Sequence, residues 1–249
     1  MRRIIRPSWF AAIILLALFA TACASDEEIG SARVFKSAPW TGAEEYTYRI
    51  TTRGVEGEGE CKLITTPEAK PGRTRLERLC GRDTFRDDGI ALVDSATLRP
   101  VSSSRTISDT AKGRATTHSV AYGEGEATFK TDDGSKVRTT MRDLPEPDRE
   151  SPEPAWYDDE ELFWLVRSVD LRSGYSGVFS YVINAGQPRV LNTRVEVIEA
   201  ERLTVPAGTF ETWKVRVQRG SSPKVIWVEQ GGTHRVIQAQ IEDARYEMK

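Results

Sequence analysis

The chain has 249 residues, 29% of them charged, and its formal net charge at pH 7 is −2. This length accommodates one large β domain or two small ones. A mildly acidic chain with interspersed charges is a poor nucleic-acid binder, so we expect no nucleic-acid partner.

Residues 1–22 have the features of a secretory signal. Three arginines in the first six residues precede the apolar run 10–19, and small residues at 20–22 lead directly to Cys23. Ten apolar residues are too few to cross a hydrocarbon core of about 30 Å. The small triplet before cysteine resembles the lipobox of bacterial lipoproteins, with Ala20 where leucine is commoner. We therefore expect a lipid on Cys23 that anchors the chain to the cell membrane or outer membrane, facing the periplasm or the cell exterior. A soluble secreted product is the alternative.

The other two cysteines predict a disulfide. Lipid on Cys23 would leave Cys61 and Cys80 as an even pair in an oxidising compartment. Closing a loop of about 20 residues would stabilise the fold by about 3 kcal/mol in the chain-entropy description. A metal site or a catalytic thiol is a weaker interpretation, because no C-x-x-C pair occurs and His118 and His234 lie far apart in the chain. We expect no metal and no cofactor.

Residues 23–43 are small and polar without periodicity, and they predict a flexible tether. From residue 44 onward, short alternating runs are separated by turn signals at intervals of about 8–12 residues, as in an antiparallel sheet. Asp87-Asp88-Gly89 is interpreted as one such turn, and 67–72 as the loop between the two cysteine-bearing strands. We expect 44–249 to form a single antiparallel β domain.

The composition changes between residues 143 and 170. Residues 143–157 contain four prolines and many carboxylates, and they predict an exposed loop. A cation site is the alternative, but the spacing of an EF-hand is missing. A helix is expected over 158–170, where Asp158 and Glu161 form an acidic capping box and apolar residues recur at helical spacing. This helix should cover the concave side of the sheet.

The C-terminal third predicts a run of paired strands. Residues 178–183 are apolar on both parities, as in a central strand covered on both faces. The stretch 193–241 alternates as a meander, with a three-residue hairpin at Pro206-Ala207-Gly208 and a two-residue hairpin at Gly231-Gly232. His234 is interpreted as a hydrogen-bonding side chain rather than a ligand or base.

The run 199–240, which contains the segments VPAGTFETWKV, IWVE and HRV, resembles bacterial envelope proteins grouped as domain of unknown function 3108. That family looks related to the open antiparallel half-barrels of periplasmic lipoprotein carriers, in which a helix covers a concave apolar cavity. The resemblance implies an all-β, mainly antiparallel fold, a strongly curved open sheet or half-barrel of about 10–12 strands with one short helix over its concave face. It brings no catalytic residues.

Two functions are expected from these features, and neither is enzymatic. The first is binding of a hydrophobic small molecule, lipid or lipoprotein in the half-barrel cavity. The candidate lining residues are Phe163, Trp164, Phe179, Tyr181, Trp213, Val215 and Trp227. The same aromatic residues would equally fill a packed core. The second function is a structural or assembly factor of the cell envelope that acts through a protein partner, with 143–161 as the contact.

An enzyme is the weakest hypothesis. The sequence contains no G-x-S-x-G, H-E-x-x-H, P-loop or Gly-rich dinucleotide motif. The sequence contains so many carboxylates that the presence of pairs does not distinguish an enzyme from a non-enzymatic protein.

Overall fold

The computed structural model describes residues 33–146, 156–186, 188–219 and 222–249. The predicted signal 1–22, the lipidation site Cys23 and the first part of the predicted tether lie outside the described residues. The middle of the predicted acidic loop, 147–155, does so as well.

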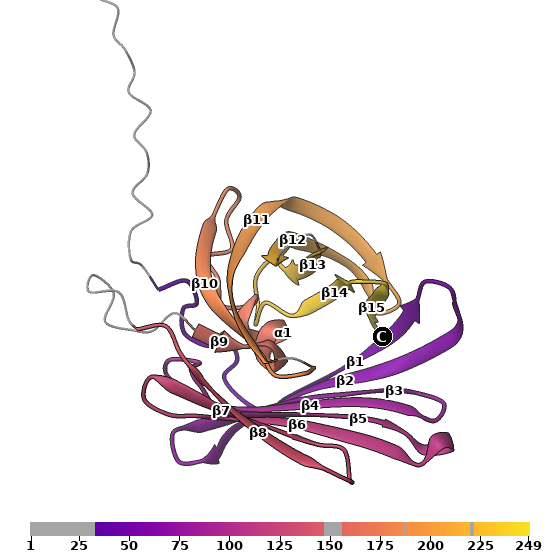
Figure 1. Cartoon of the computed structure of the whole chain (residues 1–249). Helices are drawn as coiled ribbons and strands as arrows, with labels where there is room; N and C mark the ends of the chain where they lie inside the picture. Colours follow the sequence, from indigo (N-terminus) through magenta and orange to yellow (C-terminus); the bar gives the residue numbers. More distant parts are fainter. Residues whose placement is uncertain (1–32, 147–155, 187, 220–221) are drawn as a thin grey trace, which may run out of the picture. The chain divides into compact units, whose positions relative to one another are not determined.

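In these ranges the chain forms one sheet of fifteen strands, shown in Figure 1. The strands are β1 Glu44–Thr52, β2 Val55–Lys70, β3 Arg73–Arg82, β4 Phe85–Asp94, β5 Pro100–Asp109, β6 Arg114–Tyr122, β7 Glu126–Asp132, β8 Val137–Asp143, β9 Trp156–Asp158, β10 Ser176–Ile183, β11 Arg189–Val205, β12 Gly208–Arg219, β13 Ser222–Glu229, β14 Val236–Ile241 and β15 Ala244–Met248. Their order is β8-β7-β6-β5-β4-β3-β2-β1-β15-β14-β13-β12-β11-β10-β9. The predicted all-β, mainly antiparallel, open sheet is confirmed, with more strands than the predicted number.

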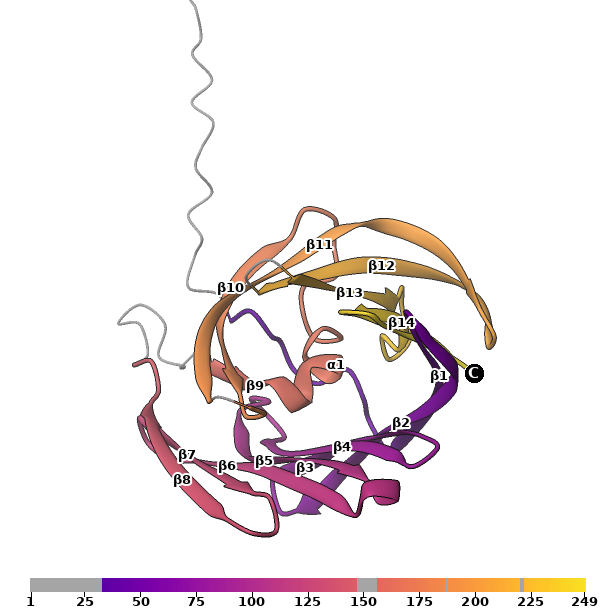
Figure 2. The ribbon, with the colours of Figure 1, turned by 45° about the vertical axis from the view of Figure 1, so that its right-hand side comes forward.

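The sheet consists of two meanders joined by the first and last strands. β1 pairs antiparallel with β15, with Tyr48 opposite Met248, so both ends of the domain meet in the middle of the sheet. β8 and β9 are the edge strands of the order, and β9 pairs parallel with β10 while every other pair is antiparallel. Figure 2 shows how the sheet curls, with α1 inside the curve.

The predicted helix over 158–170 is wrong in length, although its cap is present. A 3₁₀ turn, Asp159–Glu161, leads into the single-turn helix α1, Leu162–Leu165. Asp158 and Glu161 make the predicted capping box, but Asp158 also ends strand β9. The residues from Trp156 to Val169 are almost all buried, so contacts on every side, rather than an amphipathic surface pattern, determine the backbone.

The predicted tether is also corrected at its C-terminal end. Val34, Phe35 and Trp40 are buried members of the core. The Phe35 ring makes edge-to-face contacts with Tyr157 and Phe179, at centroid distances of 4.7 and 4.8 Å. Residues 33–43 therefore belong to the folded domain. The sequence pattern does not reveal this, because an isolated coil segment with a few apolar residues has no periodicity.

Two turn predictions are wrong, and two are refined. The predicted loop 67–72 is shorter in the structure, because β2 extends to Lys70 and only residues 71–72 connect it to β3. Asp87-Asp88-Gly89 lies within β4, because the chain turns earlier, at Asp83 and Thr84. The connection at Gly231-Gly232 runs from residue 230 to 235, longer than a two-residue hairpin. The hairpin after β11 is tighter than predicted, since Val205 pairs with Gly208 and only two residues connect the strands.

Buried apolar side chains form one large core and a smaller cluster beside it. The smaller cluster brings Val120 and Phe129, from β6 and β7, against Trp156 and Val182, from β9 and β10. Strands near the two edges of the sheet therefore contact each other through side chains, although the edge strands do not pair.

Candidate functional site

A row of polar residues crosses the inner face of the first meander. In the strand register, Arg78 of β3 is opposite Gly89 of β4, which is opposite Arg105 of β5. The same row continues through His118, Thr131 and Arg138 on β6, β7 and β8. Residues in one register row share a face of the sheet. Hence three arginines and one histidine lie on a line that runs from the core to the edge strand β8.

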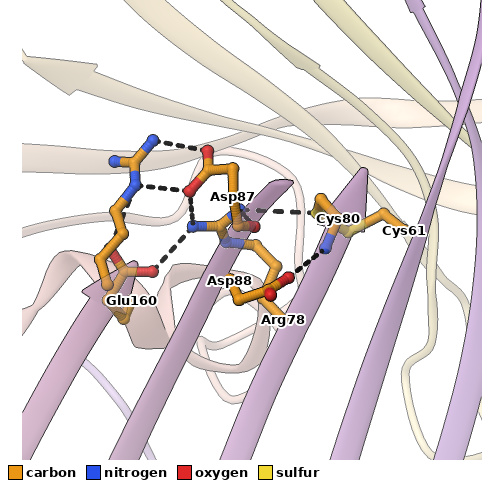
Figure 3. Close-up of a disulfide and its surroundings, with 7 residues drawn as sticks. Cys61, Arg78, Cys80, Asp87, Asp88 and Glu160 are labelled. Atoms are coloured by element: carbon orange, nitrogen blue, oxygen red, sulfur yellow. Dashed lines mark hydrogen bonds and ion pairs between the residues drawn. A yellow bond between two sulfur atoms is a disulfide. The ribbon is translucent and has the colours of Figure 1, made fainter. Parts of the chain in front are cut away.

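At the buried end of this row, two arginines and two carboxylates form a closed network (Figure 3). Arg78 Nη2 donates to Glu160 Oε2 at 2.9 Å and to Asp87 Oδ1 at 3.3 Å. Arg105 makes a two-pronged contact with Asp87, in which Nε and Nη2 each donate at 2.7 Å. Two positive and two negative charges balance here, which is the condition for burying ions at all.

The pKa values in this network follow from burial and pairing. Burial disfavours the charged guanidinium of Arg78, but Glu160 and Asp87 outweigh it and raise the pKa. Burial also acts against the ionised carboxylate of Asp87, yet hydrogen bonds and charge from Arg105 and Arg78 lower its pKa. For Glu160 burial dominates and raises the pKa despite the contact with Arg78.

Gly89 makes this approach possible. A Cβ atom at position 89 would lie 2.0 Å from Glu160 Oε2 and 3.1 Å from Arg78 Nη2. The backbone of β4 therefore carries no side chain at position 89, and the Glu160 carboxylate of the 3₁₀ turn lies directly against it.

A second polar cluster surrounds the start of that turn. The hydroxyl groups of Ser103 and Tyr122 donate to Asp158 Oδ2, and Asn184 Nδ2 donates to Ser103 Oγ at 2.9 Å. Burial raises the pKa of Asp158 well above its usual range, and the charge of Asp159 adds to the effect.

Glu161 belongs to the same turn and is completely buried. Its Oε1 accepts from the Asp158 backbone N–H at 2.7 Å, while Oε2 has no hydrogen-bond partner in the described residues. Burial raises the pKa of Glu161 well above its usual range. An uncompensated carboxylate in such surroundings favours the protonated form.

The predicted disulfide is confirmed, and it borders the charged network. Cys61 and Cys80 are direct cross-strand partners on β2 and β3, and both side chains are buried. Arg78 Nη1 lies 3.5 Å from Cys80 Sγ, and the Cys80 backbone N–H donates to Asp88 Oδ1 at 3.1 Å. Figure 3 shows the disulfide next to Arg78.

At the other end of the row lies a polar pocket of about 380 Å³. Its lining residues are Thr116, His118, Phe129, Thr131, Asp133, Arg138, Thr140, Gly186 and Pro188. His118 is buried, and its Nδ1 lies 3.1 Å from Thr131 Oγ1. Burial and the charge of Arg105 lower the pKa of His118, so the imidazole is neutral at pH 7.

The predicted cavity residues occupy a different region, the large core. Phe163, Trp164, Phe179, Tyr181 and Val215 are all buried there. Their rings contact other rings: Phe179 lies edge-to-face with Tyr181 at 5.7 Å, and Phe163 with Tyr246 at 5.5 Å.

The other two predicted tryptophans, Trp213 and Trp227, lie on opposite faces of the sheet. Trp213 is half-buried and packs against the core. Trp227 points the other way, where its Nε1 donates to Glu201 Oε2 at 2.9 Å and Lys214 Nζ lies 5.9 Å from its ring. Trp227 therefore does not share a site with the other candidates.

Sequence reasoning missed the charged row and the pocket. A signal for the first part exists, because Arg78 has the same parity as Leu76 and Cys80, which both point inward. An arginine on the inward parity of a strand predicts a buried partner. That partner, Glu160, is 82 residues away.

A model of the family described as "Protein of unknown function (DUF3108)" matches residues 44–249. Neither the curated proteins nor the solved structures contain a match to this chain. Among the helices of the described ranges, none combines the length and the apolar character that crossing a membrane requires. Within the same ranges, no three His, Cys, Asp or Glu side chains are grouped as metal ligands would be.

Proposed function

Since the chain belongs to the DUF3108 family, whose function is unknown, we propose from its own geometry that it is a non-enzymatic, lipid-anchored protein of the cell envelope that acts through a protein partner. The proposal combines an anchor at Cys23 with a rigid β domain and an exposed sheet edge.

The side-chain contacts inside the sheet carry the proposal. A carrier of hydrophobic ligands needs free apolar volume, commonly several hundred Å³, between its sheet and its helix. Here the rings of Phe35, Tyr157 and Phe179 pack against one another in that region, and Trp164 Nε1 donates to Thr65 Oγ1 at 2.8 Å. These contacts support a packed core, and hence the partner-dependent function over ligand carriage.

The edge strand β8 supports the partner. It ends the strand order of the described sheet, so one of its sides offers backbone groups for pairing. Val137 and Met141 on this strand are more than half exposed. An open edge with exposed apolar side chains suits the addition of a strand from another protein.

The contact surface differs from the one expected from the sequence. Of the acidic segment 143–161, residues Trp156, Tyr157 and Glu160 are buried in the domain. A partner therefore has no access to that part of the segment. The proposed contact is the β8 edge instead.

The anchor rests on the sequence. Residues 1–22 and Cys23 have the order of a lipoprotein signal, and the Cys61–Cys80 disulfide suits an oxidising compartment such as the periplasm. Mass spectrometry of the N-terminal peptide tests this part: a diacylated Cys23 supports it, and an unmodified or uncleaved N-terminus contradicts it.

Photo-crosslinking in living cells tests the partner. A photoreactive residue at Met141 should give a discrete higher-mass product. The same residue at Arg53, which is exposed on the β1–β2 turn, serves as the matched control. No product from position 141, or identical products from both positions, would contradict the β8 contact.

A further inference from the structure

The pocket between β6, β7 and β8 has a lining that no part of the proposed function uses. Three threonines, Thr116, Thr131 and Thr140, come from three adjacent strands, and Phe129 forms an apolar part of the wall. The register places Thr131 opposite His118 on one side and Arg138 on the other. The pocket is thus built on regular, paired strands.

Asp133 and Arg138 are the charged residues of the lining, and they oppose each other. Asp133 Oδ2 lies 3.8 Å from Arg138 Nη2. Asp133 Oδ1 accepts from the Ser135 hydroxyl and from the backbone N–H groups of Ser135 and Lys136. These bonds hold the pKa of Asp133 at about 2, so the carboxylate is ionised at neutral pH.

This charge balance selects among ligand classes. With His118 neutral, the lining has one positive and one negative charge, so an anion would meet Arg138 only together with the Asp133 carboxylate. A fatty acyl chain would offer no hydrogen-bonding group to the threonine hydroxyls and the Arg138 guanidinium of the lining, and displacing water from these groups without replacing its hydrogen bonds is costly. A neutral molecule with several hydroxyl groups satisfies both the donors and the acceptors.

We propose that this pocket binds a neutral sugar unit. Hydroxyl groups at the rim of the ring pair with Asp133, Arg138 and the threonines, since a carboxylate accepts and a guanidinium donates to adjacent hydroxyls. The C–H faces of the ring lie against Phe129. The volume of about 380 Å³ is within the range of small-molecule sites, about 300–1,000 Å³.

Ligand-observed NMR on the full chain tests the proposal with glucose, galactose and N-acetylglucosamine as separate probes. At least one sugar should show saturable binding. Arg138→Ala and Thr140→Val should each weaken that binding at least tenfold. Both residues lie on the edge strand and Arg138 is well exposed, so these changes leave the core intact.

Two control variants come from the same strand. Arg142→Ala removes an arginine that does not line the pocket, and Thr139→Val removes a threonine on the other face of β8. Both controls should bind the sugar within about twofold of the unchanged chain, a difference well below 1 kcal/mol.

Inorganic phosphate and decanoate serve as rival probes. Binding of either of them, with no binding of the three sugars, would overturn the proposal, and so would the absence of binding by any probe. Sugar binding that is unaffected by Arg138→Ala and Thr140→Val would overturn the location. None of these results depends on crosslinking from Met141, so the sugar site and the protein partner stand or fall separately.

Discussion

At the scale of single residues, Gly89 leaves the least room for a Cβ atom among the glycines of the described ranges, because the carboxylate of Glu160 lies against it. Substitution Gly89→Ala would place a methyl group 2.0 Å from Glu160 Oε2 and force the carboxylate away from Arg78. We expect a loss of about 1–3 kcal/mol in the free energy of unfolding, because the network keeps its buried charges but loses their alignment.

Urea unfolding measures this loss, and Gly123→Ala is the control. A Cβ at position 123 meets nothing closer than 3.7 Å, so the stability should change little. Equal effects of the two substitutions would show that the approach of Glu160 to β4 does not matter.

At the same scale, Glu161 should make the stability of the folded chain depend on pH. Burial raises its pKa in the folded chain above the value of about 4.3 expected in the unfolded chain. Below about pH 4.3 both states are protonated. As the pH rises further, the unfolded chain releases this proton while the folded chain retains it, so the folded state loses stability until the raised pKa is reached.

Glu161→Gln should therefore flatten the fall in unfolding free energy between pH 5 and pH 8 and raise the stability at pH 8. Part of the dependence of the unfolding free energy on pH should remain in this variant, because the pKa of Asp158 is raised as well. Glu160→Gln is the contrasting variant. It should destabilise the chain, because Arg78 then loses Glu160, the more deeply buried of its two counter-charges. An unchanged slope in Glu161→Gln would contradict the interpretation.

At the scale of elements, we expect the segment 33–43 to contribute as much to the free energy of unfolding as a core strand does. Phe35→Ala removes a buried ring that contacts Tyr157 and Phe179, and it should cost about 3–5 kcal/mol in urea unfolding. Phe85→Ala is the matched control, since Phe85 is 46% exposed and should change stability by less than about 1 kcal/mol. A small effect of Phe35→Ala would show that the segment is a tether after all.

The disulfide ties β2 to β3 at a sequence separation of 19. Replacing Cys61 and Cys80 together by alanine should lower the free energy of unfolding by about 3 kcal/mol, mainly because the unfolded chain gains conformational freedom. The unchanged chain should lose a similar amount when a reductant is added, and the alanine variant should not respond. Stability that is insensitive to both changes would contradict this role.

The elements that could be predicted from the sequence are those with local signals. Alternation at Tyr46, Tyr48 and Ile50 locates β1, and the parity of Leu76 and Cys80 locates the inner face of β3. The predicted helix is too long because the spacing of apolar residues alone does not show that neighbours surround a segment on all sides. The prediction of a turn at 87–89 is wrong because Asp87 and Gly89 are part of a buried ion network and do not reverse the direction of the chain.

At the scale of the whole molecule, the sequence predicts the class of sheet but not the content of its interior. Aromatic residues such as Phe179 and Tyr181 are compatible with a lined cavity and with a core, and only the contacts across the sheet favour the core. The sequence does not predict the polar pocket either, because the pocket combines Thr116, Phe129 and Thr140 from separate strands with Gly186 from the connection after β10.

We propose that the inside of the sheet is the protein's own core and that its function lies at the β8 edge. Native mass spectrometry of the full chain, released from cells in mild detergent and then exposed to a fluorescent fatty acid, tests this claim. We expect the mass of the chain with its covalent lipid only, and no saturable fatty-acid binding. A retained hydrophobic adduct, or saturable binding abolished by Val215→Trp, would contradict it.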